Sequence, residues 1–200
     1  MRTIGIGVAL LLGLMVVVLD GRGLTLEDAD SLASKIQRIQ QQAEAGPASS
    51  GTDVRTSVTE AEVNSWLAHY GASLLPEGVV QPRVTILGNG RVSGTAIVDL
   101  DSVARSRATG RQFDVWTLIG GRVPVTVTGR VSAAGGSGRM QIESADVSGV
   151  PVPPRVVEQL VLFYSRTSDS PDGFRVSEPF VLPAGIERVE IGPGAAVVVQ

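Results

Sequence analysis

The chain has 200 residues, of which 43% are hydrophobic, 18% are charged and only 4% are aromatic. This length corresponds to one domain of about 150 residues with additional segments. Seventeen basic and twenty acidic residues give a net charge of −3, which argues against a nucleic-acid-binding protein. The lack of cysteine excludes disulfides and thiolate chemistry, and a single histidine, His69, excludes a site built from two imidazoles.

The chain begins with an apolar run. Residues 4–19 (IGIGVALLLGLMVVVL) follow Arg2 and precede Asp20; as a helix they would span about 24 Å, slightly less than the roughly 30 Å hydrocarbon core of a bilayer. A signal peptide and a retained anchor are both possible, and because no Ala-x-Ala pattern follows Leu19 the anchor is favoured. Basic charge before the run and acidic charge after it place the N-terminus inside. We expect a protein anchored in a bacterial cytoplasmic membrane, with its domain extracytoplasmic.

A juxtamembrane helix is expected next. Thr25 can cap it, and Asp28 stands at the capping-box position. Apolar residues recur at helical spacing, at Ala29, Leu32, Ile36, Ile39 and Ala43. Two interpretations remain open, a stalk that pairs with a partner helix and a helix packed on its own domain. The small residues after Ala45 indicate a linker. The expected divisions are therefore 1–20 (anchor or signal peptide), 21–53 (juxtamembrane helix and linker) and 54–200 (extracytoplasmic α+β domain).

A second helix is more strongly specified. Thr59 is a good N-cap, and Glu62 completes a capping box. One side of this helix is apolar and is expected to face the core, with Val63, Trp66, Leu67 and Tyr70. His69 projects to the other side, and Asn64 has no obvious partner.

From residue 79 the hydrophobic period changes to two, which indicates strands. Turn sequences divide them into three hairpins, 79–100 around Gly88-Asn89-Gly90, 122–147 with a bulge near Ser144, and 189–199 around Gly192-Pro-Gly. Residues 113–118 hint at a further strand. Because the strands have a polar side, the sheet should be antiparallel and pack on one face. We expect an α+β fold in which a strongly curved antiparallel sheet, built from hairpins, packs around one or two amphipathic helices.

A third helix should start at Pro153-Pro154. Its continuous apolar side contains Val156, Val157, Leu160, Val161 and Tyr164, with Phe163 at the margin. Leu162 points roughly opposite, among polar residues. A helix that is apolar beyond one stripe is either buried between two layers or faces a lipid or a partner, and both possibilities stay open.

Residues that could carry out chemistry are scarce. Asp99 and Asp101 share a strand face, but they are more simply explained as solvated side chains next to a helix cap. No Gly-x-Ser-x-Gly elbow is present, and the one histidine lies on a helix surface. We therefore expect no catalytic residue, no metal and no cofactor, and hence a protein that is not an enzyme. Only a buried pair with perturbed pKa among Asp99, Asp101 and Asp146 would argue for one.

Hydrophobic recognition needs no such motif, because burial of acyl chains contributes about 0.8 kcal/mol per methylene. We predict a non-catalytic domain that binds or presents a lipid or another hydrophobic ligand in an apolar groove. The candidate lining residues are Val63, Trp66, Leu67, Val156, Leu160, Val161 and Phe163. The alternative is a structural or protein-interaction module with a solid core, which contacts an envelope protein through the Leu162 side.

Three sequence segments carry a resemblance to a known type of protein. They are Thr59-Glu-Ala-Glu-Val-Asn64, Val150-Pro-Val-Pro-Pro154 and Phe180-Val-Leu-Pro-Ala-Gly-Ile186. With the apolar N-terminus and the hairpins, the chain resembles small membrane-anchored envelope proteins of the tubular lipid-binding type (the YpmS-like and LmeA-like families) over roughly residues 55–200. The resemblance implies a helix cradled by a curled antiparallel sheet and a lipid-associated role, and it supplies no catalytic residues.

Overall fold

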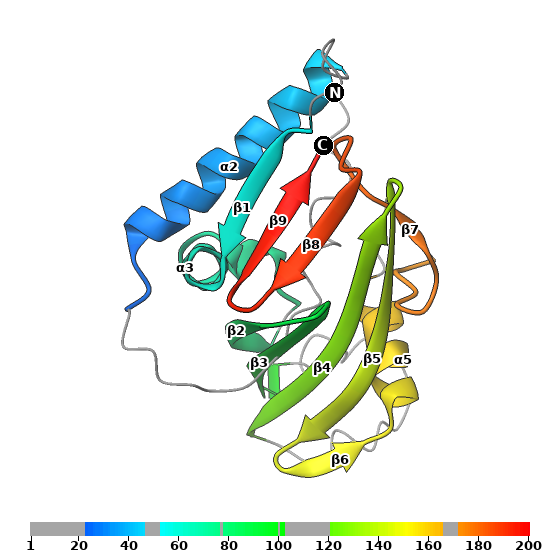
Figure 1. Ribbon diagram of the computed structural model, residues 1–200. Coiled ribbons are helices and arrows are strands. Elements are labelled where there is room, and N and C mark those ends of the chain that lie inside the picture. Colours follow the sequence, from blue (N-terminus) through cyan, green and yellow to red (C-terminus); the bar gives the residue numbers. More distant parts are fainter. Residues whose placement is uncertain (1–22, 47–52, 77, 100, 103–120, 166–171) are drawn as a thin grey trace.

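A computed structural model describes residues 23–46, 53–76, 78–99, 101–102, 121–165 and 172–200, with only the backbone described for residues 163 and 164. Over these residues the fold is α+β, with three α-helices and a nine-stranded antiparallel sheet (Figure 1). The helices are α2 (Leu26–Ala45), α3 (Glu60–His69) and α5 (Pro154–Tyr164), and a short 3₁₀ helix, η1 (Gly71–Leu74), follows α3. The predicted fold class is thus confirmed at this level, whereas the apolar run 4–19, most of the linker and the strand at 113–118 lie outside the described residues.

The strands are β1 (Arg55–Thr59), β2 (Val79–Gly88), β3 (Arg91–Asp99), β4 (Arg122–Ala134), β5 (Ser137–Val147), β6 (Val150–Val152), β7 (Phe180–Val181), β8 (Arg188–Gly192) and β9 (Ala195–Val199). Their order is β1-β9-β8-β4-β3-β2, and β5 pairs with the other side of β4. The short strands β6 and β7 pair with opposite ends of β5.

All three predicted hairpins are present, as β2–β3, β4–β5 and β8–β9. In the first turn Asn89 and Gly90 both have positive φ, at 54° and 75°, which is the conformation that matches the twist of a two-residue hairpin. In the second hairpin the register shifts by one residue at Glu143, which confirms the bulge expected near Ser144.

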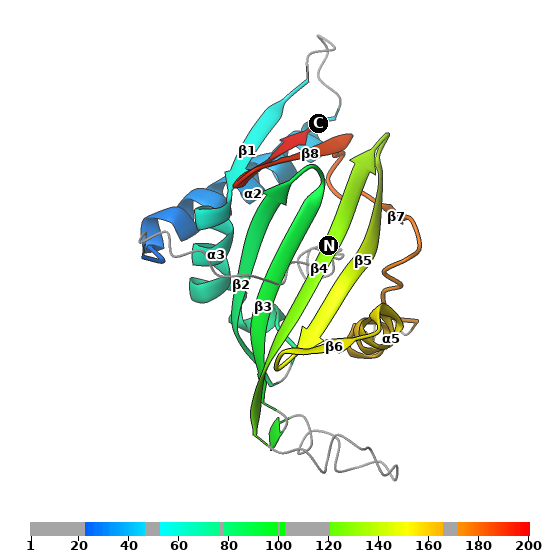
Figure 2. The ribbon, with the colours of Figure 1, turned by 60° about the horizontal axis from the view of Figure 1, so that its bottom comes forward.

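The expectation of a strongly curved sheet wrapped around helices is wrong. In Figure 2 the sheet is an open, twisted layer, with α3 beside β2 and α5 beside β5 and β6. Strands β4 and β5 pair at ten positions with a single bulge, so the ladder is interrupted only once. Gly90, Gly136 and Gly149 have positive φ in turns and serve to reverse the chain.

Helix α2 packs on α3, so the second interpretation of the juxtamembrane helix, packing on its own domain, is the one observed. Ala29 and Leu32 are buried in this contact. Thr25 caps α2 as predicted, because its hydroxyl accepts a hydrogen bond from Asp28 N at 3.1 Å. In a complete capping box the backbone N–H of Thr25 would donate to the side chain of Asp28. Here it donates to Ser65 Oγ of α3 instead, at 3.2 Å.

Polar side chains of α3 cover the edge of β2, the last strand in the order. The buried Asn64 side chain accepts from Val84 N at 2.6 Å and donates to Val84 O at 2.7 Å. Glu60 accepts from Ile86 N at 2.7 Å. An uncovered strand edge invites pairing with another chain, so Asn64, which lacked an obvious partner in the sequence, protects this edge.

Candidate functional site

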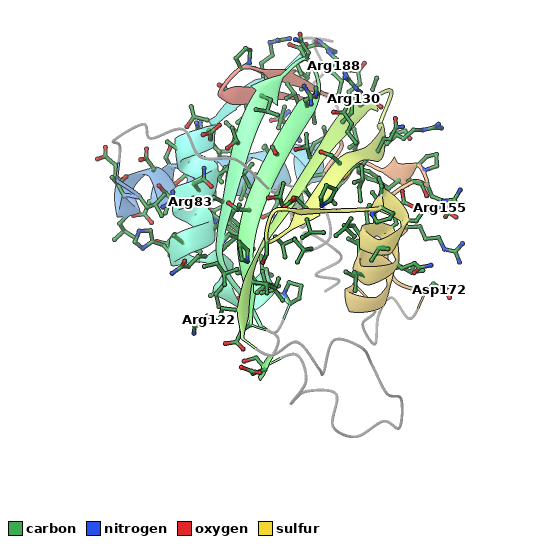
Figure 3. All side chains as sticks on the ribbon, turned by 90° about the horizontal axis from the view of Figure 1, so that it is seen from below. Arg83, Arg122, Arg130, Arg155, Asp172 and Arg188 are labelled. Carbon is green, nitrogen blue, oxygen red and sulfur yellow. The ribbon has the colours of Figure 1, made fainter. Side chains whose placement is uncertain are left out.

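The valines of β4 and the aliphatic residues of β5 share one face of the sheet, which we call the inner face. Residues paired across adjacent strands share a face, so the register Val84–Gly94–Val127–Ala145 runs along a single face across β2, β3, β4 and β5. Both hydrophobic clusters of the described residues contain inner-face positions, one under α3 and one under α5. The two helices therefore pack on the same face, at opposite margins of the sheet (Figures 2 and 3).

The cluster under α3 is closed. Its buried members are Leu67, Val84 and Ile86, and Val63 and Trp66 pack against them. Tyr70, which was expected on the same apolar side, is instead 43% exposed. Its hydroxyl donates a hydrogen bond to Asp30, and this bond raises the pKa of Tyr70. The α3 cluster is thus ordinary core that fixes this helix to β2.

The cluster under α5 has its buried members on β5 and in the segment after the helix. Met140, Ile142 and Val176 are buried, and Val157 and Val161 of α5 pack against them. The rings of Phe174 and Phe180 meet edge to face, with centroids 5.5 Å apart. Phe174 and Val176 were not among the predicted site residues, because they lie in an irregular segment without a periodic pattern.

The inner-face valines of β4 border the α5 cluster, and two of them, Val127 and Val131, pack against it. The inward valines of β4 are all half-buried, and we call them the β4 valine strip: Val123, Val125, Val127 and Val131. The five described aliphatic residues of α5 are also half-buried: Val156, Val157, Leu160, Val161 and Leu162. Leu162 is therefore not the exposed outlier that the helical wheel predicted, whereas Arg155 lies on the side of α5 away from the strands (Figure 3).

The seven candidate lining residues do not form one group. Val63, Trp66 and Leu67 belong to the α3 cluster. On α5, Val161 packs into the second cluster, and Val156 and Leu160 are half-buried on the same helix. Phe163 is part of α5, but its side chain lies outside what the structure describes. The half-buried aliphatic surface of the inner face is thus the β4 valine strip together with α5, of which Val127, Val131 and Val161 also contact the α5 cluster.

The three carboxylates that could have suggested an enzyme each have a local structural partner. Asp99 accepts from Ser102 N at 3.0 Å and pairs with Arg122. Asp101 accepts from Gly121 N at 3.2 Å, and Asp146 accepts from Gly149 N at 2.6 Å. Each carboxylate thus accepts a hydrogen bond from a backbone N–H, which is a structural role.

Near the β4–β5 bulge the opposite, outer face of the sheet carries charged side chains. Arg91 and Arg130 are direct cross-strand neighbours, an arrangement that is unfavourable for like charges. Glu143, at the bulge, accepts from both guanidinium groups, at 2.7 and 3.1 Å. The hydrogen bond from Arg91 is the main cause of the lowered pKa of Glu143. The bulge thus places a carboxylate that binds both arginines and offsets the repulsion between their charges.

None of the described helices is long and apolar enough to cross a membrane. Comparison with protein-family models, with curated proteins and with solved structures finds no match to this chain.

Proposed function

We propose that this chain is a membrane-tethered, non-catalytic protein whose extracytoplasmic domain binds or presents a lipid or another hydrophobic ligand. The ligand would lie on the inner face, along the β4 valine strip and against α5. One observation carries the proposal: all inward valines of β4 and all described aliphatic residues of α5 are half-buried. The tether is the apolar run 4–19.

The shape of this surface favours a chain-like ligand. From Val123 to Val131 the strip covers eight residue steps, or about 26 Å at about 3.3 Å per residue. Each methylene that a ligand buries there contributes about 0.8 kcal/mol, and half-buried valines have apolar area left to cover. An elongated strip thus suits an acyl chain better than a compact ring system.

Native mass spectrometry of the full chain, extracted from membranes in mild detergent, tests the proposal. We expect a retained lipid mass, with a ratio of lipid-bound to lipid-free protein about fivefold lower in Val125→Gln, because losing about 1 kcal/mol of contact changes affinity by that factor. Ser132→Gln, on the outer side of the same strand, is the matched control and should keep the lipid.

The competing hypothesis is a structural or interaction module that binds an envelope protein and no lipid. It predicts folded preparations without lipid, or lipid that is held away from the inner face and is therefore retained equally by Val125→Gln and Ser132→Gln. Either result would reject the proposed ligand surface.

A further inference from the structure

Exposed apolar side chains occur at the start of α2, at the C-cap of α3 and at the end of η1. Among the described residues, half of the exposed large hydrophobic side chains lie here: Leu24 (36% exposed), Leu26 (54%), Tyr70 (43%) and Leu74 (38%). We call these four residues the α2–η1 patch. Of the others, Val54 immediately precedes β1, and Leu87, Val150 and Val181 lie on β2, β6 and β7.

Two hydrogen bonds hold the parts of this patch together. Thr25 N donates to Ser65 Oγ at 3.2 Å, which fixes the start of α2 to α3. Tyr70 donates its hydroxyl hydrogen to the carboxylate of Asp30. Leu26 and Asp30 are one helical turn apart and so lie on one side of α2. Leu26 and Tyr70 therefore border the same surface.

The sequence limits how far this surface can be from a tether. The apolar run ends at Leu19, five residues before Leu24. Five residues of extended chain reach at most about 18 Å. If residues 4–19 cross the bilayer, the start of α2 is confined to the immediate neighbourhood of the membrane surface.

From this juxtaposition we propose that the α2–η1 patch rests on the outer surface of the bilayer and sets the orientation of the domain on the membrane. The inference depends on the tether in the proposed function. Leucine and tyrosine are suited to the membrane interface, where the ring of tyrosine is buried and its hydroxyl stays hydrated. The neighbouring Glu27, Asp28 and Asp30 give no attraction to anionic headgroups. Contact is therefore apolar, and it does not increase with anionic lipid.

Site-directed quenching tests this orientation, since the chain has no cysteine to remove. Leu26→Cys and Leu74→Cys are labelled with a bimane fluorophore in the full chain and reconstituted into phosphatidylcholine vesicles with and without doxyl-labelled lipid. Val181→Cys, at the 86% exposed position on β7, is the control. We expect quenching at positions 26 and 74 to be at least about twofold greater than at position 181, and unchanged by added phosphatidylglycerol.

The outcomes separate the two proposals. If the protein floats with the vesicles but positions 26 and 74 are quenched no more than position 181, the orientation is wrong and the tether stands. If the protein does not float with the vesicles, the tether is wrong and the orientation is rejected with it.

Discussion

The carboxylate of Glu62, on α3, connects this helix to α2. It accepts from Lys35 Nζ at 2.6 Å, from Ser31 Oγ at 2.5 Å and from Thr59 N at 2.9 Å. Burial raises the pKa of Glu62, but the hydrogen bonds from Lys35, Ser31 and Thr59 and the charge of Lys35 outweigh this effect, and the pKa is lowered overall. The ionised form is therefore the one that the fold stabilises.

Glu62→Gln should lower the free energy of unfolding by about 2 kcal/mol at neutral pH, because a largely buried Lys35 loses its counter-charge. A lowered pKa in the folded state means that the contribution is complete above the ordinary glutamate pKa of about 4.3 and is lost as pH falls through the lowered value. Urea unfolding at several pH values should show the difference from wild type shrinking below about pH 4. Glu178→Gln, in an exposed ion pair, is the control and should change the free energy of unfolding little. If the difference between Glu62→Gln and wild type stays constant into strong acid, the ionised Glu62 carboxylate is not what stabilises the fold.

For single residues, hydrogen-bond partners that are close in the sequence could be predicted and distant partners could not. The capping box of Thr59 and Glu62 involves positions three apart and is present as predicted. The partner of Asn64 is the backbone of Val84, on another element, and no spacing rule identifies it. Thr25 was predicted correctly as a cap, but the acceptor of its backbone N–H is Ser65, forty residues away.

At the scale of elements, the turns of the two long hairpins differ in one testable respect. Gly90 and Gly136 occupy the same turn position, with φ of 75° and 71°. A Cβ on Gly90 would lie 2.9 Å from the backbone oxygen of Val131, whereas a Cβ on Gly136 would meet nothing within 4 Å. Gly90 is therefore required both by its positive φ and by the close approach of Val131, whereas Gly136 is required by its positive φ alone.

Gly136→Ala should therefore cost about 1 kcal/mol, the strain of a left-handed alanine. Gly90→Ala should cost about 2–4 kcal/mol, because the backbone of β4 must also move. Free energies of unfolding from urea titrations of the two variants measure the difference directly. Equal losses would show that the close approach to Val131 does not constrain the turn.

Elements with local signals were predictable, and elements stabilised only by distant pairing were not. The Asn-Gly turn and the alternating valines specify β2–β3 and β4–β5 within the hairpins themselves. Strand β1 has five residues and pairs entirely with β9 at the far end of the chain, so nothing within its own sequence shows that it has a partner. Strands β6 and β7 have three and two residues, too short for a period to be read.

At the scale of the whole molecule, the sequence predicts which side chains face inward but not how they are covered. The alternation of β4 places its valines on the inner face, as expected. Whether the sheet curls around a helix depends on bulges and on strand register over several elements, and only one register shift lies in the β4–β5 ladder. The two helices lie at the margins of the face, and the β4 valine strip is half-buried, with Val127 and Val131 packed in the α5 cluster.

Photo-crosslinking in membranes tests most directly whether this strip holds a lipid. The full chain is irradiated with a phospholipid that carries a diazirine in its acyl chain, and tryptic peptides are analysed by mass spectrometry. We expect label in residues 123–130 and 156–166, the tryptic peptides that carry most of the strip and the apolar side of α5, in addition to any label in the N-terminal apolar run. Label confined to residues 1–22, with the strip and α5 unmodified, would contradict it.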